Sequence, residues 1–428
     1  MHIRRVRIDG IRSISKLAWD LPPHQNAAGW HVIIGDNGSG KSTFLRSIAL
    51  ALIGPTEPGA LRQDWAGWLP AGKNTSGRIE LNVSHEAYWD WWSGKGMTSE
   101  DPLDLSATIK PGDHAAVLGF SRNSILKRSI WVSGKPGWFS AGYGPFRRFE
   151  GGDPESSKGY YAFPKVGRHL SVFGENVALT ECLQWLRTLK HRQLEQSDSV
   201  NFFDRVKAFV NATDLLPYGT KLDEVSADEV KFVDGNGYVV PVQLLGDGFR
   251  SILSMTFELI RQLQDVFGSE RVFSEDTVPL ILPPGVVLID EVDAHLHPSW
   301  QRGIGQWFTK YFPNMQFIVT THSPLVCWSA SDGSIFLLPP PGSQEVGRMV
   351  EGEDRKRLVN GTILDAYSTE LFGQGVSRSE AAQAKVEKLA DLNVKQLSES
   401  LSPDEVKTQR ELKESLPTSA ENVIRNQT

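Results

Sequence analysis

A glycine-rich segment near the start of the chain constrains the fold more than any other feature. Residues 35–42 read Gly-Asp-Asn-Gly-Ser-Gly-Lys-Ser, a complete G-x-x-x-x-G-K-S phosphate-binding loop. The apolar run at 30–34 predicts a strand before it. Ser42 to Ile53 predict a helix after it, because apolar residues recur there every three or four positions. A strand, a glycine turn and a helix in this order predict a nucleotide-binding α/β core.

The loop residues explain how this segment would hold phosphate groups. Glycines let backbone N–H groups approach phosphate oxygens closely, and the N-terminus of the following helix favours negative charge. We expect Lys41 to reach the β- and γ-phosphates of ATP and the Ser42 hydroxyl to bind Mg²⁺. A chance glycine-rich turn is the alternative, which the strand and helix context makes the weaker one. The expected nucleotide contacts are Gly35, Asp36, Asn37, Gly38, Ser39, Gly40, Lys41, Ser42 and Thr43.

Two later motifs carry the residues expected to act on ATP. Residues 286–291 read Val-Val-Leu-Ile-Asp-Glu, an apolar strand that ends in two carboxylates. We expect Asp290 to bind Mg²⁺, usually through water, and Glu291 to position and activate the attacking water. An ordinary strand before an acidic turn is the alternative, and the accompanying motifs weaken it. After another apolar strand, residues 320–324 read Thr-Thr-His-Ser-Pro, which predicts His322 beside the γ-phosphate.

The histidines are weaker indicators of function than the carboxylates, because a lone histidine is more often a surface or core residue than a catalytic one. The role of His322 therefore rests on the residues around it. His295 and His297 have the spacing of a metal site, but we favour a turn followed by a helix start for this segment.

Composition is compatible with such a core and excludes several classes of protein. The chain is 40% hydrophobic and 22% charged, as globular proteins are. No apolar run approaches the roughly 20 residues that span a bilayer, so we expect no membrane partner. The presence of only two cysteines fits a reducing cytosol, so we expect a cytoplasmic location. The two cysteines, Cys182 and Cys327, are expected to be buried free thiols. The net charge of −6 gives no global attraction to nucleic acid.

The 428 residues predict an α/β fold of the P-loop type, with a central mixed sheet, covering helices, an inserted lobe of strands and helices, and a helical tail. We expect residues 1–55 and 241–345 to form the ATPase core. Residues 56–240 would be the inserted lobe, which also contributes to the ATPase sheet. Residues 346–428 would be the C-terminal helical tail, disordered at its end.

Local patterns predict several elements outside the motifs. Strands are expected at 78–83 and 124–132, helices at 174–213 and 248–266, and a hairpin at 230–240 around an Asp-Gly-Asn-Gly turn. Tryptophans of the inserted lobe are expected to fill its core. In the tail, Ser402 before Pro403 predicts a capped helix start. Apolar residues at three-to-five-residue spacing precede it, namely Val386, Leu389, Leu392, Leu397 and Leu401.

A fourth motif, Leu-Leu-Gly-Asp-Gly-Phe-Arg-Ser at 244–251, lies between the phosphate loop and the carboxylates. The four motifs in this order resemble the ABC-type ATPases outside the transporters: the SMC and break-repair ATPases, the OLD-family ATPases and the ATPases of bacterial anti-phage systems. Residues 1–55 and 240–340 carry the likeness.

Smaller features are most similar to the defence ATPases, and the Septu ATPase subunits are the nearest group. These features are the Gly-Ile-Arg-Ser turn at 10–13 and the Asp-Glu-Val-Asp-Ala-His-Leu-His-Pro stretch. In the tail, Leu-Phe-Gly at 371–373 and Ser-Arg-Ser-Glu at 377–380 also resemble them.

The resemblance implies a head-to-tail dimer of ATPase domains. Lys41 and Ser42 of one chain would bind ATP together with Gly246, Asp247 and Gly248 of the other. The usual serine of this motif is replaced here by Gly246. The family's coupling loop matches Asp293. Its glutamine loop has two candidates, Gln63 and the segment 143–148, and a simple loop is the favoured interpretation of both.

The resemblance also implies partners. A separate nuclease effector subunit of the HNH type would work beside the ATPase, since the chain itself carries no nuclease pattern. DNA or RNA contact is implied by the family. Short basic clusters at 127–128, 147–148 and 190–192 could meet phosphates, although a solvated face is the stronger interpretation. A DNA-repair ATPase acting on DNA is the first alternative, and a transporter ATPase is the second.

Overall fold

The computed structural model divides the chain into two compact units, Met1–Gly361 and Thr362–Thr428. The structure describes the chain apart from residues 24, 71–74, 94–101, 133–136, 148, 150–161, 175–178, 180, 198–199, 344, 373–379 and 417–428. None of the described helices combines the length and apolarity that a bilayer crossing needs.

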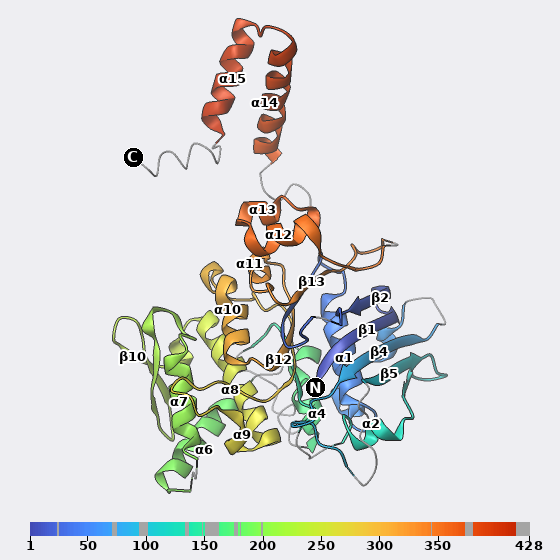
Figure 1. Ribbon diagram of the computed structural model, residues 1–428, viewed down its shortest axis with the longest axis vertical. Helices are drawn as coiled ribbons and strands as arrows, with labels where there is room; N and C mark the ends of the chain where they lie inside the picture. The colour runs from blue at the N-terminus through green and yellow to red at the C-terminus, as the bar shows by residue number, and fades with distance from the viewer. Residues whose placement is uncertain are drawn as a thin grey trace. The chain divides into compact units, whose positions relative to one another are not determined.

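A six-stranded mixed sheet forms the centre of the first unit (Figure 1). Its order is β14 (Arg348–Met349), β13 (Ser334–Leu337), β3 (Gly29–Ile34), β12 (Met315–Thr320), β11 (Gly285–Ile289) and β7 (Ser140–Tyr143). The five strands from β13 to β7 are parallel, and β14 is antiparallel at the edge. Strands β11 and β12 are buried along their whole length, as parallel strands covered on both faces are. The predicted mixed α/β sheet is confirmed.

A second sheet of five antiparallel strands faces the first across helix α1. Its order is β2 (Ile14–Asp20), β1 (His2–Ile11), β4 (Gly77–Ser84), β5 (Leu103–Lys110) and β6 (Val117–Phe120). Strands from the first 20 residues therefore pair with strands from the inserted segment, across the boundary predicted at residue 55. The strands alternate between buried apolar and exposed polar residues, so one face of this sheet packs on the core.

Helix α1 (Lys41–Ile53) is the centre of the core between the two sheets. It contacts β1, β4 and β5 on one side and β7, β11 and β12 on the other. Phe44, Leu45 and Ile48 are fully buried, and nearly every other residue of the helix is buried too. Burial on nearly every side is typical of a helix enclosed in the core of a domain. The P-loop at its N-terminus is thus fixed to both sheets.

The other face of the central sheet is covered by helices from the second half of the unit (Figure 1). Helix α10 (Pro298–Tyr311) packs Phe308 against Trp30 of β3 and Phe317 of β12. The remaining helices of this half are α8 (Asp247–Phe267), α9 (Ser269–Val272), α11 (Pro324–Cys327) and α12 (Gly352–Asn360).

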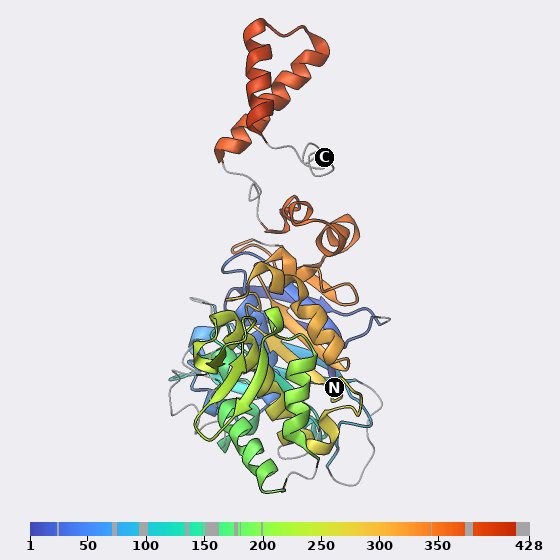
Figure 2. The same ribbon diagram turned by 90° about the vertical axis from the view of Figure 1, so that its left-hand side faces the viewer.

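A small lobe of helices and strands follows the second sheet in the chain (Figure 2). Helices α6 (Glu181–Leu194) and α7 (Phe202–Ala212) contact β8 (Lys221–Val225), which pairs with β9 (Val230–Val233) and then β10 (Val239–Pro241). The predicted helices and the predicted hairpin are confirmed here. Shorter helices of the unit are α2 (Ser124–Arg128), α4 (Pro164–Gly167), α5 (Leu170–Phe173), and the 3-10 turns Pro58–Leu61, Ala66–Trp68, Pro217–Gly219 and Val242–Leu244.

The strand predicted at 124–132 is wrong, because this segment begins with helix α2. The Asn123 side chain accepts a hydrogen bond from the Ile125 N–H at 2.9 Å and caps the helix. The predictions for the tryptophans and cysteines fare better. The prediction of a tryptophan-filled core is confirmed for Trp68, Trp131 and Trp138, which are buried, and is wrong for Trp91, which is 38% exposed. Cys182 and Cys327 are buried and free, as predicted.

The second unit is mainly a helical hairpin. It contains α13 (Ile363–Tyr367), the 3-10 turn Glu370–Phe372, α14 (Glu380–Ser398) and α15 (Pro403–Ser415). Ser402 and Glu405 form the capping box that starts α15, so the predicted helix start is confirmed. Lys395 pairs with Glu405 across the hairpin at 2.7 Å. The tail motif residues at 373 and 377–379, and the end predicted to be disordered, lie outside the described residues.

Candidate nucleotide-binding site

The phosphate loop connects β3 to α1 in the predicted order and follows a path that needs glycine. Gly38 and Gly40 have φ angles of 80° and 102°, which side chains rarely adopt. A Cβ atom on Gly40 would lie 2.9 Å from Ile14 Cγ1 of the neighbouring β-strand. The Lys41 ammonium donates to the carbonyls of Gly35 at 2.8 Å and Asp36 at 2.9 Å, so its charge is held over the loop.

Polar groups at the mouth of the loop fit a phosphate ligand. The N-terminus of α1 has no side-chain cap, because its N-cap residue is Gly40, and the first N–H groups of a helix lack partners within the helix. Ser39 is only 4% exposed, and its hydroxyl has no hydrogen-bond partner among the described residues. A buried hydroxyl of this kind normally finds a partner. The loop therefore offers donors suited to phosphate oxygens.

The two carboxylates lie at the C-terminal end of β11, where its neighbours fix the backbone. The Asp290 N–H donates to the Tyr143 carbonyl of β7 at 2.8 Å. The Thr320 hydroxyl, at the end of β12, donates to Asp290 Oδ1 at 2.6 Å and accepts from the Glu291 N–H at 2.8 Å. One hydroxyl thus sets the orientation of the Asp290 carboxylate and the position of the next peptide.

Glu291 occupies a strained backbone conformation directly after the strand. Its φ angle is +46°, in the left-handed region. That region costs a non-glycine residue about 1–2 kcal/mol, which the surrounding structure must offset. His295 repeats the feature with φ of +65°. Residues 291–295 therefore form a tight turn that reverses the chain after β11.

Electrostatics shows that the distant motifs meet around Lys41. Burial lowers the pKa of Lys41, and the negative charges of Asp290, Glu291, Asp36 and Asp293 oppose this shift. Four carboxylates separated by up to 257 positions in the chain thus act on one ammonium group. The structure brings the phosphate loop and the carboxylate pair into one site, as expected from the motifs.

The donor set is suitable for Mg²⁺ bound together with phosphates. Magnesium usually takes one or two protein oxygens and completes its shell with water and phosphate oxygens. Ser42 is half-buried at the start of α1, and the Asp290 carboxylate is held by Thr320. No cluster of three or more His, Cys, Asp or Glu ligands occurs among the described residues.

Arg147 belongs to the candidate segment 143–148, but the sequence did not predict its role at the carboxylates. The Arg147-Arg148 pair favours a solvated basic face in the sequence, and this interpretation is wrong for Arg147, which is 4% exposed. Its guanidinium donates to the Asp290 carbonyl at 2.9 Å and to the Glu291 carbonyl at 3.1 Å. Burial lowers its pKa to about 10, against the opposing charges of Asp290, Asp293 and Glu291. Arg148 lies outside the described residues.

The two candidates for the glutamine loop lie in different surroundings. The Gln63 amide donates to backbone carbonyls of Leu61 at 3.3 Å and Phe173 at 3.5 Å. Tyr143 and Arg147, in the other candidate segment, contact the backbone of Asp290 at the start of residues 290–295, which we call the carboxylate turn. Of the two, the segment beginning at Tyr143 is the one that the structure brings to Asp290.

The Gly246–Asp247–Gly248 segment forms the start of α8. Gly246 is the N-cap and offers no side chain, and both Gly246 and Asp247 are exposed. Asp247 forms an ion pair with Arg250 in the first turn. Gly248 packs on the carboxylate turn, where an added Cβ atom would lie 2.8 Å from the His295 carbonyl oxygen. The helix start is therefore open to solvent on one side and in contact with the 291–295 turn on the other.

The histidine motif lies at the end of β12 beside the carboxylates. His322 is exposed, whereas Thr321 before it is buried. The Thr321 hydroxyl donates to Asp293 Oδ1, so the carboxylate of the predicted coupling loop is fixed by the histidine motif. His297 is the N-cap of α10 and accepts from the Ser299 N–H, which confirms the helix start favoured for this segment.

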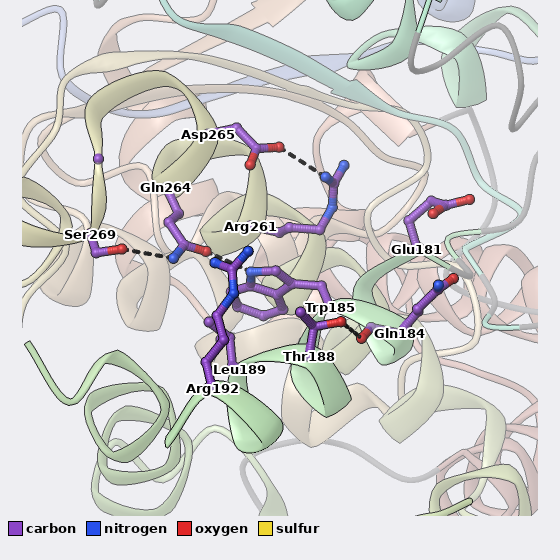
Figure 3. A pocket seen from close by; sticks show the side chains of 11 residues that line it. Glu181, Gln184, Trp185, Thr188, Leu189, Arg192, Arg261, Gln264, Asp265 and Ser269 are labelled. Carbon is purple, nitrogen blue, oxygen red and sulfur yellow. Dashed lines mark hydrogen bonds and ion pairs between the residues drawn. The ribbon is translucent and has the colours of Figure 1, made fainter. Parts of the chain in front are cut away.

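A pocket of about 380 Å³ lies away from these motifs, between α6 and the C-terminal part of α8 (Figure 3). Trp185 forms its wall, and the indole N–H donates to Gln264 at 2.6 Å. Arg261 is engaged by Asp265 at 2.9 Å. Because its lining residues come from α6, α8 and the start of α9, and not from the phosphate loop, the pocket is not the nucleotide site.

Two family models match parts of the chain. Residues 5–91 match an "AAA domain". Residues 184–327 match a model described as "AAA domain, putative AbiEii toxin, Type IV TA system". The two matches contain the phosphate loop and the carboxylate pair, respectively.

The curated relatives are named for Septu and retron systems. The "Septu protein PtuA" of Bacillus mycoides is 24% identical over 359 residues, which is 83% of this chain and 42% of the relative. The "Retron Ec83 probable ATPase" of Escherichia coli is 41% identical over 106 residues, 25% of this chain and 18% of the relative. The "Retron Vc95 probable ATPase" of Vibrio cholerae is 31% identical over 27% of this chain and 22% of the relative. The chain spans less than half the length of the curated relatives it matches.

Solved structures include an SMC head bound to the C-winged helix domain of ScpA, with a TM-score of 0.49 and 16% identity over 82% of this chain and 98% of that chain. The family resemblance that the motifs predicted is confirmed by the curated relatives and the family models. The chain is similar to the Septu proteins PtuA and to the probable ATPases named for retron systems, and two segments of it match AAA domains.

Proposed function

We propose that this protein is the ATP-binding and ATP-hydrolysing subunit of a multi-subunit anti-phage defence complex. The observation that carries the proposal is the meeting of Lys41, Asp290 and Glu291 in one site, held by Thr320. The relatives named for Septu and retron systems support the biological setting. In this proposal the bound nucleotide sets the shape of the assembly, and slow hydrolysis resets it.

Each motif residue has a distinct task in the proposed reaction. Lys41 and the loop N–H groups bind the β- and γ-phosphates, and Ser42 and Asp290 hold Mg²⁺, which neutralises phosphate charge when bound. Glu291 accepts the proton of the attacking water, and His322 contacts the γ-phosphate from the end of β12. The exposure of His322 leaves it accessible to a ligand in this position.

The site is proposed to be completed by a second copy of the chain. A helix N-terminus attracts phosphate, and α8 begins with the exposed Gly246 and Asp247. Backbone N–H groups at Gly248 would face the γ-phosphate of the partner's ATP. Because Gly246 has no hydroxyl, these N–H groups and the helix dipole carry the contact. Asp293, fixed by Thr321, lies in the turn that would link the two sites.

The partner is proposed to be a separate nuclease subunit, of the HNH type, docked on the tail. On the described parts of α14, Leu397 is 90% exposed and Val394 is 66% exposed. Apolar side chains at such exposure suit a protein interface better than a free helical pair. We also propose that the complex contacts DNA or RNA directly, because the resemblance to the defence and repair ATPases implies such contact.

Native mass measurement of the complex purified from cells, with and without ATP, tests this proposal. We expect at least a dimer of this chain together with a second, nuclease-like polypeptide. A chain that stays monomeric with and without ATP contradicts the shared site. Co-purification with DNA-repair proteins and no nuclease-like subunit would favour the alternative of a repair ATPase acting on DNA.

A further inference from the structure

The Arg147 guanidinium joins three segments that are far apart in the chain. It donates to the Gly144 carbonyl at 3.0 Å in its own loop, to the Ser251 hydroxyl on α8 at 3.1 Å, and to the carboxylate turn. Its acceptors in that turn are the carbonyl oxygens of Asp290 at 2.9 Å, Glu291 at 3.1 Å and Val292 at 3.4 Å.

The carboxylate turn needs such support at Glu291. The left-handed conformation of this residue is held from both sides, since its N–H donates to Thr320 and its carbonyl accepts from Arg147. These two groups flank the Glu291 Cα atom and so fix the direction in which the side chain leaves the backbone. Loss of either bond frees a strained peptide to relax.

The same turn is in contact with α8 at two points. The Ser251 hydroxyl accepts a hydrogen bond from Arg147, which in turn binds the carboxylate turn. Gly248, one turn earlier in the helix, packs directly against the His295 carbonyl. A displacement of the first turns of α8 therefore acts on residues 291–295 by both routes. Packed elements of this kind shift together instead of deforming continuously.

We propose that Arg147 is a positioning residue that sets the direction of the Glu291 side chain and couples it to the start of α8. This inference rests on the proposed function, in which Glu291 activates water and the α8 N-terminus completes the site of a second chain. Docking of the partner's nucleotide on α8 would then be transmitted through Ser251 and Arg147 to the water-activating carboxylate.

The geometry calls for arginine specifically. The guanidinium presents five N–H donors in a planar fork, and here they meet four carbonyls and one hydroxyl. A lysine at this position would keep the charge but reach only some of these acceptors from a single nitrogen. The Arg147→Lys variant therefore separates the effect of the positive charge from the effect of the planar set of five N–H donors.

The test compares Arg147→Gln and Arg147→Lys with the wild-type chain, each with and without Glu291→Gln. Arg355→Gln is the matched control, because the Arg355 guanidinium also donates to three backbone carbonyls, those of Ala330, Ser331 and Gly333, away from the carboxylate turn. The measurements are ATP affinity, kcat, melting temperature and amide hydrogen exchange of the peptide spanning 288–296.

We expect Arg147→Gln to lower kcat by about tenfold or more and to leave the ATP Kd within about threefold. Arg147→Lys should recover part of kcat. Exchange at 288–296 should become faster in the Arg147 variants and stay unchanged in Arg355→Gln. In the Glu291→Gln background the Arg147 substitution should have no further effect on residual turnover, because it acts through Glu291.

Several results overturn the inference. Wild-type kcat in both Arg147 variants does so, and so does an equal further loss in the Glu291→Gln background. Weaker ATP binding with a lower melting temperature and unchanged exchange assigns Arg147 a structural role alone. If Arg147→Gln does not fold, Ser251→Ala is used instead, because it removes only the hydrogen bond between Arg147 and α8. A wild-type kcat in Ser251→Ala then rejects the coupling between α8 and Glu291. Wild-type turnover in Glu291→Gln would instead reject the proposed function itself.

Discussion

The hydroxyl of Thr320 lies 2.6 Å from Asp290 Oδ1 and orients this carboxylate from the neighbouring parallel strand. The same oxygen accepts the Glu291 N–H at 2.8 Å. A single side chain on β12 therefore positions both members of the carboxylate pair on β11. The end of β12 also leads into the histidine motif, so the two strands present one continuous polar edge.

Replacing Thr320 with valine, which has nearly the same shape, should uncouple the carboxylates from β12. A hydrogen bond to a charged group contributes about 1.5–3 kcal/mol, so kcat should fall roughly ten- to a hundredfold if the bond acts mainly on turnover. Thr320→Ser keeps the hydroxyl and serves as the control. Steady-state ATPase assays of the two variants check this, and equal activities would remove Thr320 from the site.

Mixing two inactive variants should recover activity if the site is shared between chains. A Lys41→Ala chain keeps an intact start of α8. A Gly246→Glu chain places a negative charge at the exposed N-cap of α8, where an added Cβ atom lies 3.7 Å from Phe249, and keeps Lys41 and Glu291 intact. A mixed dimer then contains one intact composite site, and statistical mixing should give about one quarter of wild-type turnover. Turnover is measured across mixing ratios at constant total protein. A strict average of the two parents at every ratio would contradict the shared site.

Stability should fall below about pH 6, because two histidines are buried in neutral form. Burial lowers the pKa of His31 to about 4 and of His169 to about 3, with Arg168 and Lys165 adding to the latter. In the unfolded chain both have pKa values near 6.5. The unfolded state therefore binds more protons than the folded state between these pKa values. The free energy of unfolding decreases as the pH is lowered through this range.

The slope of this loss is about 1.4 kcal/mol per pH unit for each histidine. Denaturant unfolding at a series of pH values checks it, with His169→Gln expected to remove the contribution of that residue between about pH 6 and pH 4. His191→Gln is the matched control, since the His191 side chain is exposed. An acid profile unchanged by His169→Gln would show that this histidine is not held neutral in the folded chain.

Removal of residues 376–428 should abolish co-purification of the effector and leave ATP binding largely intact. A finer test replaces the exposed Leu397 and Val394 with glutamate, which places charge on the proposed docking face without deleting the hairpin. Lys388→Glu, at another exposed position of α14, controls for charge alone. Full recovery of the effector with both the deletion and the double variant would place the docking surface elsewhere.

Much of the nucleotide site could be predicted because its residues are tied to local patterns. The apolar run before Gly35 and the three-to-four spacing after Ser42 encode a strand and a helix without reference to the rest of the chain. The carboxylate pair is likewise readable, since Asp290 follows a continuously apolar strand.

The non-local pairings could not be predicted in this way. Nothing near β7 indicates that it lies beside β11, and this pairing is what brings Arg147 to Asp290. Four of the five acceptors of Arg147 are backbone carbonyls, which every sequence contains, so its sequence context indicates only a basic pair within a candidate loop segment. In the sequence, Thr320 is recognisable only as part of the motif around His322, because its hydrogen-bond partners, Asp290 and Glu291, follow a different strand. Segment 124–132 reads Ser-Ile-Leu-Lys-Arg-Ser-Ile-Trp-Val, and a short mixed stretch of this kind fits a strand or a helix until a cap such as Asn123 decides between them.

The proposed mechanism depends most on the separation of ATP binding from ATP hydrolysis. Lys41→Ala removes the ammonium that is held over the phosphate loop, and Glu291→Gln removes the base while keeping the shape of the side chain. Nucleotide affinity and turnover should be measured side by side for both variants. We predict that Lys41→Ala loses ATP binding, and that Glu291→Gln binds ATP like the wild-type chain, loses most turnover and accumulates as an ATP-bound dimer. Wild-type turnover by the Glu291→Gln protein would contradict this mechanism.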